Sequence, residues 1–115
     1  VRALRDRVGA DAEIQAWLGP CIGPQAFEVG AEVPQAFAQN GFDTRGLAEV
    51  HPERPGKWLL NLAGLARQRL ERLGIQTIRG NDGTASWCTV SDPARWFSHR
   101  RDRVSGRLAA LIWRV

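Results

Sequence analysis

The stretch KWLLNLAGLARQRLERLG, residues 57–74, carries the clearest pattern in the sequence. Its apolar residues recur at helical spacing and form one stripe: Leu59, Leu62, Ala66, Leu70 and Leu73. Charged and polar side chains lie on the opposite side, as in an amphipathic helix. Gly74 follows at the position where a glycine commonly ends a helix. The pattern therefore predicts a helix over residues 57–73 that packs through its apolar stripe.

The residues before this helix predict a series of short elements. Residues 1–8 show helical spacing that Gly9 ends, and no capping residue precedes them, so the chain is expected to begin inside a helix. Residues 13–19 alternate like a strand, and FEVG at 27–30 is extended again. Between them, GPCIGP at 19–24 predicts a rigid loop whose backbone amides could face a ligand. Residues 31–41 predict a helix that stops at Gly41, and residues 42–56 predict a loop.

The residues after the helix predict strands and a final hairpin. IQTIRG at 75–80 alternates like a strand, NDGTAS at 81–86 is turn material, and WCTV at 87–90 is a short strand. Ser91 is suited to cap one helical turn that contains Pro93. FSHRRD and RLAALIW predict two hairpin strands, and the second, at 108–113, is apolar on both faces and is expected in the buried centre of a sheet. The element order predicts an α+β fold with helices over a mostly antiparallel sheet.

Composition limits the class of protein. The 115 residues suit one domain, and the net charge of +4 is carried by fifteen arginines and one lysine. Arginine binds carboxylate and phosphate through a planar fork, although genomic base composition explains the bias equally well. Cys21 and Cys88 fit no zinc pattern, and we expect free thiols in a reducing cytoplasm. Methionine is absent, so a processed product or a fragment is expected, and no signal-peptide or membrane-spanning pattern is present.

The run WFSHRRDRVSGR, residues 96–107, is the strongest local indication of a ligand. On an extended strand, Phe97, His99 and Arg101 share one face, and Asp102 points the other way. If Phe97 anchors that face to the core, Arg101 is partly buried and its charge needs a partner. A bound anion and an internal ion pair with Glu28 or Glu32 both remain open at this stage.

Other residues with chemical potential are isolated from one another in the sequence. His51, in a proline-rich loop, is expected at the surface, whereas His99 lies among arginines and is the better candidate for a site. Cys21 is either an activated nucleophile or a small buried thiol. No P-loop, dinucleotide-binding glycine motif or nucleophile elbow is present. The residues alone predict an α+β domain whose arginine-rich hairpin favours anions, without a complete catalytic set.

Four longer stretches together resemble a known family. WLGPCIGPQAFEVGAEV (17–33), KWLLNLAGLARQRLERLGI (57–75), CT (88–89) and WFSHRRDRVSGRLAALIW (96–113) occur in the same order and at similar spacing in the laccase-domain family. Its members have been called multicopper polyphenol oxidases, purine nucleoside phosphorylases and peptidoglycan editing factors. The resemblance covers essentially the whole chain, and Trp96, His99 and Ser105 are mild departures from the usual residues. The family domain is about twice as long, so residues 1–115 are expected to be a single incomplete domain, the C-terminal half.

The resemblance implies more than the residues alone. It implies part of a four-layer α/β/β/α fold with mixed sheets, and phosphorolysis of a purine nucleoside, adenosine or inosine, with adenosine deamination as a related activity. The family's zinc or copper ligands, two histidines and a cysteine, belong to the missing N-terminal half, so no metal is expected on this chain alone. For phosphate and substrate the expected residues are Arg100 and Arg101, with Arg107, His99 and Cys21 in support.

Alternatives to an enzyme remain open. The chain could be a basic module that holds RNA against Trp96 and Phe97, or a fragment without activity of its own. The enzyme interpretation is preferred over RNA binding because the arginines gather in one short run. Polyphenol oxidation ranks below nucleoside chemistry, since a multicopper site needs many histidines and this chain has two. Separated from the missing half, the chain is expected to be inactive and to self-associate through exposed apolar surface.

Overall fold

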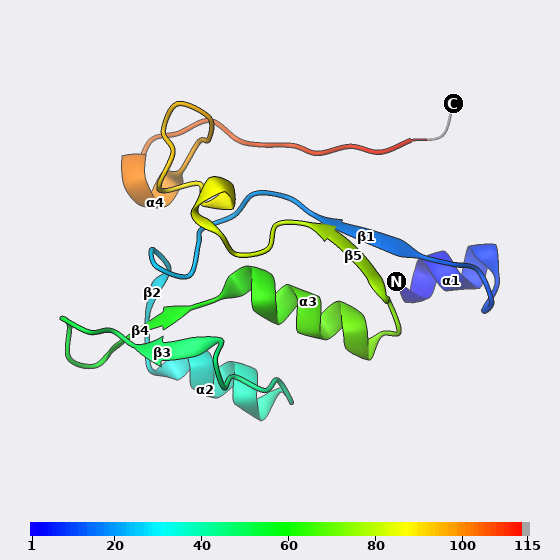
Figure 1. Ribbon diagram of the computed structural model, residues 1–115, viewed down its shortest axis with the longest axis horizontal. Coiled ribbons are helices and arrows are strands. Elements are labelled where there is room, and N and C mark those ends of the chain that lie inside the picture. Colours follow the sequence, from blue (N-terminus) through cyan, green and yellow to red (C-terminus); the bar gives the residue numbers. More distant parts are fainter. Residues whose placement is uncertain (114–115) are drawn as a thin grey trace.

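A computed structural model describes residues 1–113 and contains five helical segments and five strands (Figure 1). The helical segments are α1 (Arg2–Val8), α2 (Glu32–Gln39), α3 (Leu62–Arg72), the 3-10 turn η1 (Ala85–Trp87) and α4 (His99–Asp102). The strands are β1 (Gln15–Leu18), β2 (Glu28–Gly30), β3 (Ala48–Val50), β4 (Lys57–Leu60) and β5 (Thr77–Gly80). None of the helices in this range combines the length and the apolar character needed to span a membrane.

The strands form two small sheets. β1 and β5 pair in parallel, with Gln15 opposite Thr77 and Leu18 opposite Gly80. The second sheet is antiparallel in the order β2-β4-β3. α3 leads from β4 of one sheet to β5 of the other, and α2 lies beside the three-stranded sheet (Figure 1). The predicted α+β class is confirmed, and the pairing is mixed rather than mostly antiparallel.

The boundary of the central helix differs from the prediction. Residues 57–60 form the middle strand β4 instead of the first turn of a helix, and α3 begins only at Leu62. Asn61 is the reason, because its side-chain oxygen accepts a hydrogen bond from the Gly64 amide at 2.8 Å and so caps the helix. Leu60, immediately before this cap, is fully buried. The prediction missed this division because apolar spacing alone does not separate a buried strand from a helix.

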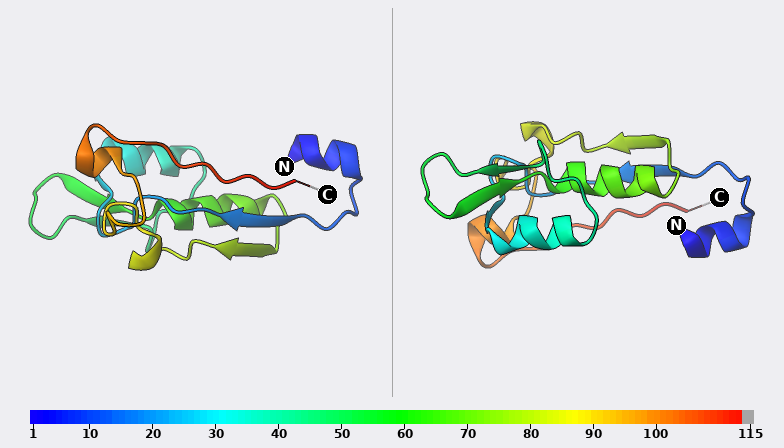
Figure 2. Two further views of the ribbon diagram at one scale, coloured as in Figure 1. Left: turned by 90° about the horizontal axis from the view of Figure 1, so that it is seen from above. Right: turned by 90° about the horizontal axis from the view of Figure 1, so that it is seen from below.

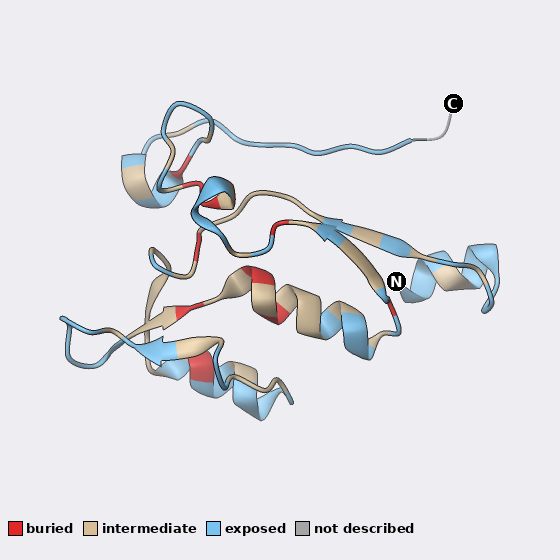
Figure 3. Ribbon diagram, viewed as in Figure 1, coloured by how far each residue is buried: buried red, intermediate tan, exposed pale blue. Residues whose placement is uncertain are grey.

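The core is small, and its buried apolar residues lie at the end of β4, in the first half of α3, after α3 and after η1 (Figure 3). Its buried apolar side chains are Leu60, Ala63, Leu65, Ile75 and Cys88. The predicted polar face of the helix also contributes to the fold. Arg67 donates to the carbonyl oxygens of Ile78 and Asn81, each at 3.0 Å, and ties α3 to the end of β5.

The predicted C-terminal hairpin is wrong. Residues 99–102 form the helical turn α4, whose N-cap Ser98 is buried and accepts a hydrogen bond from the Arg101 amide at 3.3 Å. The chain leaves α4 through Arg103, at a positive φ of 64°, and continues to residue 113 without regular structure (Figure 2). The apolar residues expected in a central strand are exposed, Leu111 by 82% and Ile112 by 99%. The capping serine and the contacts of Arg101 favour a turn over the extended strand.

Two smaller predictions are also corrected. The stretch at 87–90 forms no strand but a single parallel bridge between Cys21 and Cys88. The turn that contains Pro93 is capped by Asp92 rather than Ser91, since the Asp92 carboxylate accepts from the amides of Ala94 and Arg95. Asp92 lies one residue closer to the turn and its carboxylate reaches both amides.

Candidate functional site

Arg101 is bound on all sides by its own chain. Its Nη1 donates to the carbonyl oxygens of Thr89 at 2.9 Å and Val90 at 3.2 Å, and its Nη2 donates to that of Trp96 at 3.1 Å. Nε and Nη2 each donate to the Asp102 carboxylate at 2.7 Å. An arginine has five N–H donors, and these contacts use all of them. An additional anion could bind Arg101 only by displacing one of these acceptors.

The expectation that Asp102 points away from Arg101 is therefore wrong. It assumed an extended strand, in which adjacent side chains point to opposite faces, whereas in α4 the long Arg101 side chain reaches the Asp102 carboxylate. The hydrogen bonds from Arg101 lower the pKa of Asp102 below its ordinary value, so the carboxylate stays charged at neutral pH. The pair fastens α4 to the segment at 89–96.

Arg100, the next residue back along α4, is in a different position. It is exposed, its Nη1 donates to the carbonyl oxygen of Glu28 at 3.0 Å, and its guanidinium lies 5.7 Å from the centre of the Phe27 ring. These contacts orient the side chain over β2 and engage one of its N–H groups. Arg100 is thus oriented by the fold while its charge still faces solvent.

A cluster that the sequence did not predict surrounds the carboxylate of Glu28. Arg54 Nη1 lies 3.0 Å and His51 Nε2 lies 3.5 Å from Glu28 Oε2. His51 Nδ1 accepts a hydrogen bond from the Glu53 amide at 3.1 Å, which assigns the proton of the neutral ring to Nε2. The side chain of His51 is only 17% exposed, so its expected surface position is wrong. Because Arg100 binds the backbone of Glu28, the cluster brings two arginines and a histidine to one strand.

The remaining predicted site residues lie near α4 to different degrees. His99 is the exposed first residue of α4, and Arg107 is exposed on the segment that follows it. Cys21 belongs to the Gly19–Pro24 loop and is connected to α4 through Cys88 and Thr89, whose carbonyl oxygen Arg101 binds. His99, Arg100 and Arg101 are thus consecutive residues of α4, and Cys21 is linked to Arg101 only indirectly, through the bridge to Cys88 and the carbonyl group of Thr89.

The Gly19–Pro24 loop is tied down by its own hydrogen bonds. The Cys21 amide donates to the Trp87 carbonyl oxygen at 3.2 Å, and the Gly23 amide donates to the Cys88 sulfur at 3.2 Å. The buried Asn81 side chain donates to the Gly19 carbonyl oxygen at 3.0 Å. The amides of Cys21 and Gly23 are thus already used, so these two do not face a ligand as expected for the loop.

The aromatic residues of the basic run are partly covered as well. The Arg95 guanidinium lies 5.0 Å from the Trp96 ring centre and occupies one face of the indole. The indole nitrogen of Trp96 is buried without a hydrogen-bond partner among residues 1–113. Phe97 is 54% exposed. A base of RNA could therefore not stack on the covered face of Trp96, which weakens the case for this pair as an RNA platform.

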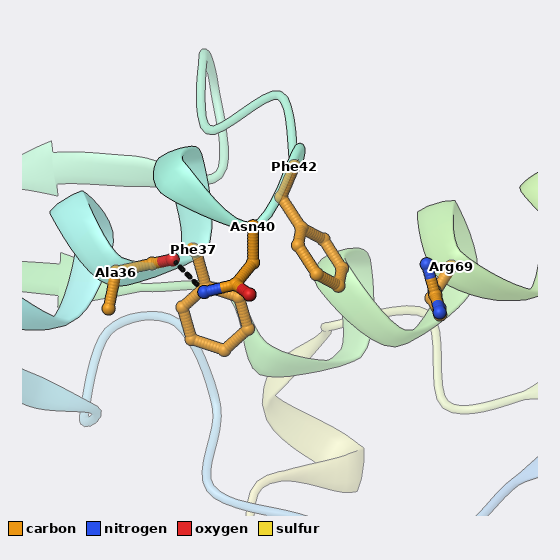
Figure 4. A pocket seen from close by; sticks show the side chains of 5 residues that line it. All are labelled: Ala36, Phe37, Asn40, Phe42 and Arg69. Carbon is orange, nitrogen blue, oxygen red and sulfur yellow. Dashed lines mark hydrogen bonds between the residues drawn. The ribbon is translucent and has the colours of Figure 1, made fainter.

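Two cavities formed by described residues lie away from α4. One, of about 420 Å³, lies between α2 and α3 and is lined by Ala36, Phe37, Asn40, Phe42 and Arg69 (Figure 4). The other, of about 690 Å³, lies between β1 and the exposed segment at 110–112. Neither contains a candidate site residue, so we place the candidate site on the surface formed by α4 and β2.

A family model described as multi-copper polyphenol oxidoreductase laccase matches residues 1–115. The chain belongs to this family. It is 50% identical over 100 residues to a purine nucleoside phosphorylase of Xylella fastidiosa, which covers 87% of this chain and 37% of that protein. It is 43% identical over 114 residues to the purine nucleoside phosphorylase PA4543 of Pseudomonas aeruginosa, which covers 98% of this chain and 45% of that protein.

A solved structure also resembles this member of the laccase family. The crystal structure of the Neisseria meningitidis protein NMB0706 matches with a TM-score of 0.64 and 40% identity, over 75% of this chain and 33% of that one. The predicted family resemblance is confirmed. The chain spans less than half the length of these relatives.

The family description names copper, and residues 1–113, the part of the chain that the structure describes, do not fit a copper site. Within residues 1–113, no three side chains of histidine, cysteine, aspartate or glutamate gather so that they could hold a metal ion. His51 and His99 belong to different elements, and His51 has both ring nitrogens engaged by Glu28 and Glu53. No chemical step is therefore assigned to a metal on these residues.

Proposed function

We propose that this chain is part of a purine nucleoside phosphorylase and that α4 and β2 form its phosphate-binding surface. The naming of its relatives supports this reaction, in which a phosphate oxygen attacks C1′ of the ribose while the bond to the base breaks. Inosine and adenosine are the substrates we propose, as the resemblance implies. Because the chain spans less than half of its relatives, we propose that activity requires the rest of the longer protein.

The observation that carries the proposal is that two adjacent arginines make different contacts: Arg101 binds only its own chain, whereas the charge of Arg100 faces solvent. Arg101 donates hydrogen bonds to Thr89, Val90, Trp96 and Asp102. These bonds hold α4 in place. Arg100 is then presented on a rigid turn, oriented by Phe27 and the Glu28 carbonyl oxygen. A guanidinium held in this way binds a phosphate dianion through charge-assisted hydrogen bonds at low entropic cost.

The other candidates take supporting roles in this proposal. His99 and Arg107 lie exposed before and after Arg100 and add donors and positive charge for the phosphate. Arg101 becomes a positioning residue, and Cys21 belongs to the wall behind α4. Arg54, 3.0 Å from the Glu28 carboxylate, offsets the negative charge that Glu28 brings to this surface, and Arg101 does the same for Asp102.

The test is phosphorolysis by the longer protein that contains this chain. We expect Arg100→Ala to raise the KM for phosphate by roughly ten- to a hundredfold, and to change the KM for inosine little, because the lost contact is charge-assisted and specific to the anion. Arg45→Ala is the matched control, since Arg45 is an exposed arginine that pairs only locally with Asp43. An unchanged KM for phosphate in Arg100→Ala would remove Arg100 from the site.

A further inference from the structure

Two cysteines that are far apart in sequence lie side by side in the structure. Cys21 and Cys88 are partners in a parallel bridge, in which the Cys21 amide donates to the Trp87 carbonyl oxygen and the Thr89 amide donates to that of Cys21. Bridge partners on neighbouring strands are about 4.8 Å apart at Cα, and in a parallel pair their side chains leave the same face. Disulfides form at Cα separations of about 4.4–6.8 Å. The fold therefore places both thiols within reach of each other.

The loop approaches Cys88 closely because residue 23 is a glycine. A Cβ at Gly23 would lie 2.9 Å from the Cβ of Cys88 and 3.1 Å from its sulfur. A larger residue at position 23 would therefore push the loop away from Cys88. The Gly23 amide also donates a hydrogen bond to the Cys88 sulfur. The sulfur of Cys21 accepts from Asn81 Nδ2 at 3.3 Å. Each sulfur thus accepts a hydrogen bond, the Cys88 sulfur from Gly23 and the Cys21 sulfur from Asn81.

The two thiols differ in acidity and in exposure. Burial raises the pKa of Cys21, an effect that the hydrogen bond from Asn81 opposes and that the nearby Cys88 increases. Burial also raises the pKa of Cys88, but hydrogen bonds from Ser91, Gly23 and Val90 outweigh it and bring the pKa below its ordinary value. Cys88 is buried and Cys21 is half-buried. An oxidant therefore reaches Cys21 first, while Cys88 has the larger thiolate fraction for a second step.

We propose that Cys21 and Cys88 are a redox modification site that closes to an intramolecular disulfide and fastens the Gly19–Pro24 loop to the segment before α4. The co-reactant is a small disulfide such as oxidised glutathione. The Cys21 thiolate attacks one of its sulfurs and releases one glutathione thiolate. The Cys88 thiolate then attacks the Cys21 sulfur and releases the second. Two protein thiols and one small disulfide become one protein disulfide and two small thiols.

The test equilibrates the full chain with mixtures of reduced and oxidised glutathione, blocks the remaining thiols and measures intact mass. We expect a monomeric product that has lost two hydrogens, and a linked pair of peptides containing Cys21 and Cys88 after digestion. At the same mixture in denaturant, we expect the ratio of disulfide to dithiol to fall at least about tenfold, because the fold no longer holds the thiols together. Circular dichroism of the native sample confirms that it is folded.

Single substitutions provide the matched controls. Cys88→Ser should stop at a glutathione adduct on Cys21, and Cys21→Ser should leave the buried Cys88 reduced. The proposal is overturned if the unsubstituted chain accumulates only that adduct on Cys21 while Cys88 stays free. Disulfide-linked dimers in place of the monomeric product, or an equal ratio with and without denaturant, would also overturn it.

Discussion

Asn81 offers a quantitative test of how the Gly19–Pro24 loop is held in place. Its side chain is 2% exposed and makes three contacts. It donates to the Gly19 carbonyl oxygen at 3.0 Å and to the Cys21 sulfur at 3.3 Å, and its oxygen accepts from the Gly83 amide at 2.9 Å. Asn81→Ala removes all three and leaves the Gly19 carbonyl oxygen and the Gly83 amide without these partners.

The expected cost follows from these contacts. Two hydrogen bonds to backbone contribute about 1 kcal/mol each, and leaving a partly buried carbonyl unsatisfied adds about 1 kcal/mol or more. The total is about 2–4 kcal/mol, which corresponds to a roughly thirtyfold to several-hundredfold larger population of the locally opened state. Because Cys88 is buried beneath this loop, it is accessible to a thiol reagent mainly in that opened state.

The assay is the rate at which Cys88 reacts with a thiol reagent under native conditions, in a Cys21→Ser background that leaves one thiol. Asn81→Ala should raise this rate by about thirtyfold or more. Asn40→Ala is the matched control, since Asn40 is an exposed asparagine whose side chain donates only to Ala36 in its own helix. It should change the rate less than about threefold. Equal rates in the two variants would refute the assignment of Asn81 as the residue that anchors the loop.

Four further predictions concern Arg101, Asp102, the exposed apolar residues and metal content. Arg101→Lys should expose Cys88 to the reagent nearly as much as Arg101→Ala, because an ammonium group cannot replace a fork that reaches three carbonyl oxygens and Asp102; labelling like that of the unsubstituted chain would contradict this. Since the pKa of Asp102 is lowered in the fold, its stabilisation of α4 should be complete above the unfolded-state value near 4 and should be lost as pH falls below it, so the urea midpoint of unfolding should fall on acidification and Asp102→Asn should weaken this dependence; the same pH dependence in the variant would contradict it. The exposed Leu111 and Ile112 should drive self-association of the isolated chain, and Ile112→Asp should reduce it in size-exclusion chromatography; a monomer at all concentrations would refute this expectation. Metal analysis of the dialysed chain should find less than one equivalent of zinc or copper, and one tightly bound ion per chain would show that a donor set has been missed.

The amino-acid sequence by itself determined the features that depend on neighbouring residues. The alternation at 13–19 and 75–80 predicted β1 and β5, and the stop at Gly41 predicted the end of α2. These signals are local, because turn residues and side-chain periodicity act within one or two turns of the chain. The family was also accessible from sequence, since its motifs span almost the whole chain and the family model matches the same residues.

The tertiary structure decided how distant residues meet. Glu28 meets His51 and Arg54 only because β2 pairs with β4, whose preceding loop carries both residues, and Arg100 reaches the same strand from 72 residues away. Cys21 and Cys88 likewise become neighbours through a single bridge. No spacing in the sequence encodes such contacts, because they depend on the path of the chain between the partners.

The basic run at 96–107 shows why the sequence pattern and the tertiary structure can indicate different conformations for the same segment. Its alternating pattern is compatible with a strand, and a strand would have separated Arg101 from Asp102. The capping oxygen of Ser98 and the carbonyl oxygens of Thr89, Val90 and Trp96 instead stabilise a helical turn that pairs them. A segment of four residues has little intrinsic preference of its own, so contacts with the surrounding chain determine its conformation and the role of each arginine.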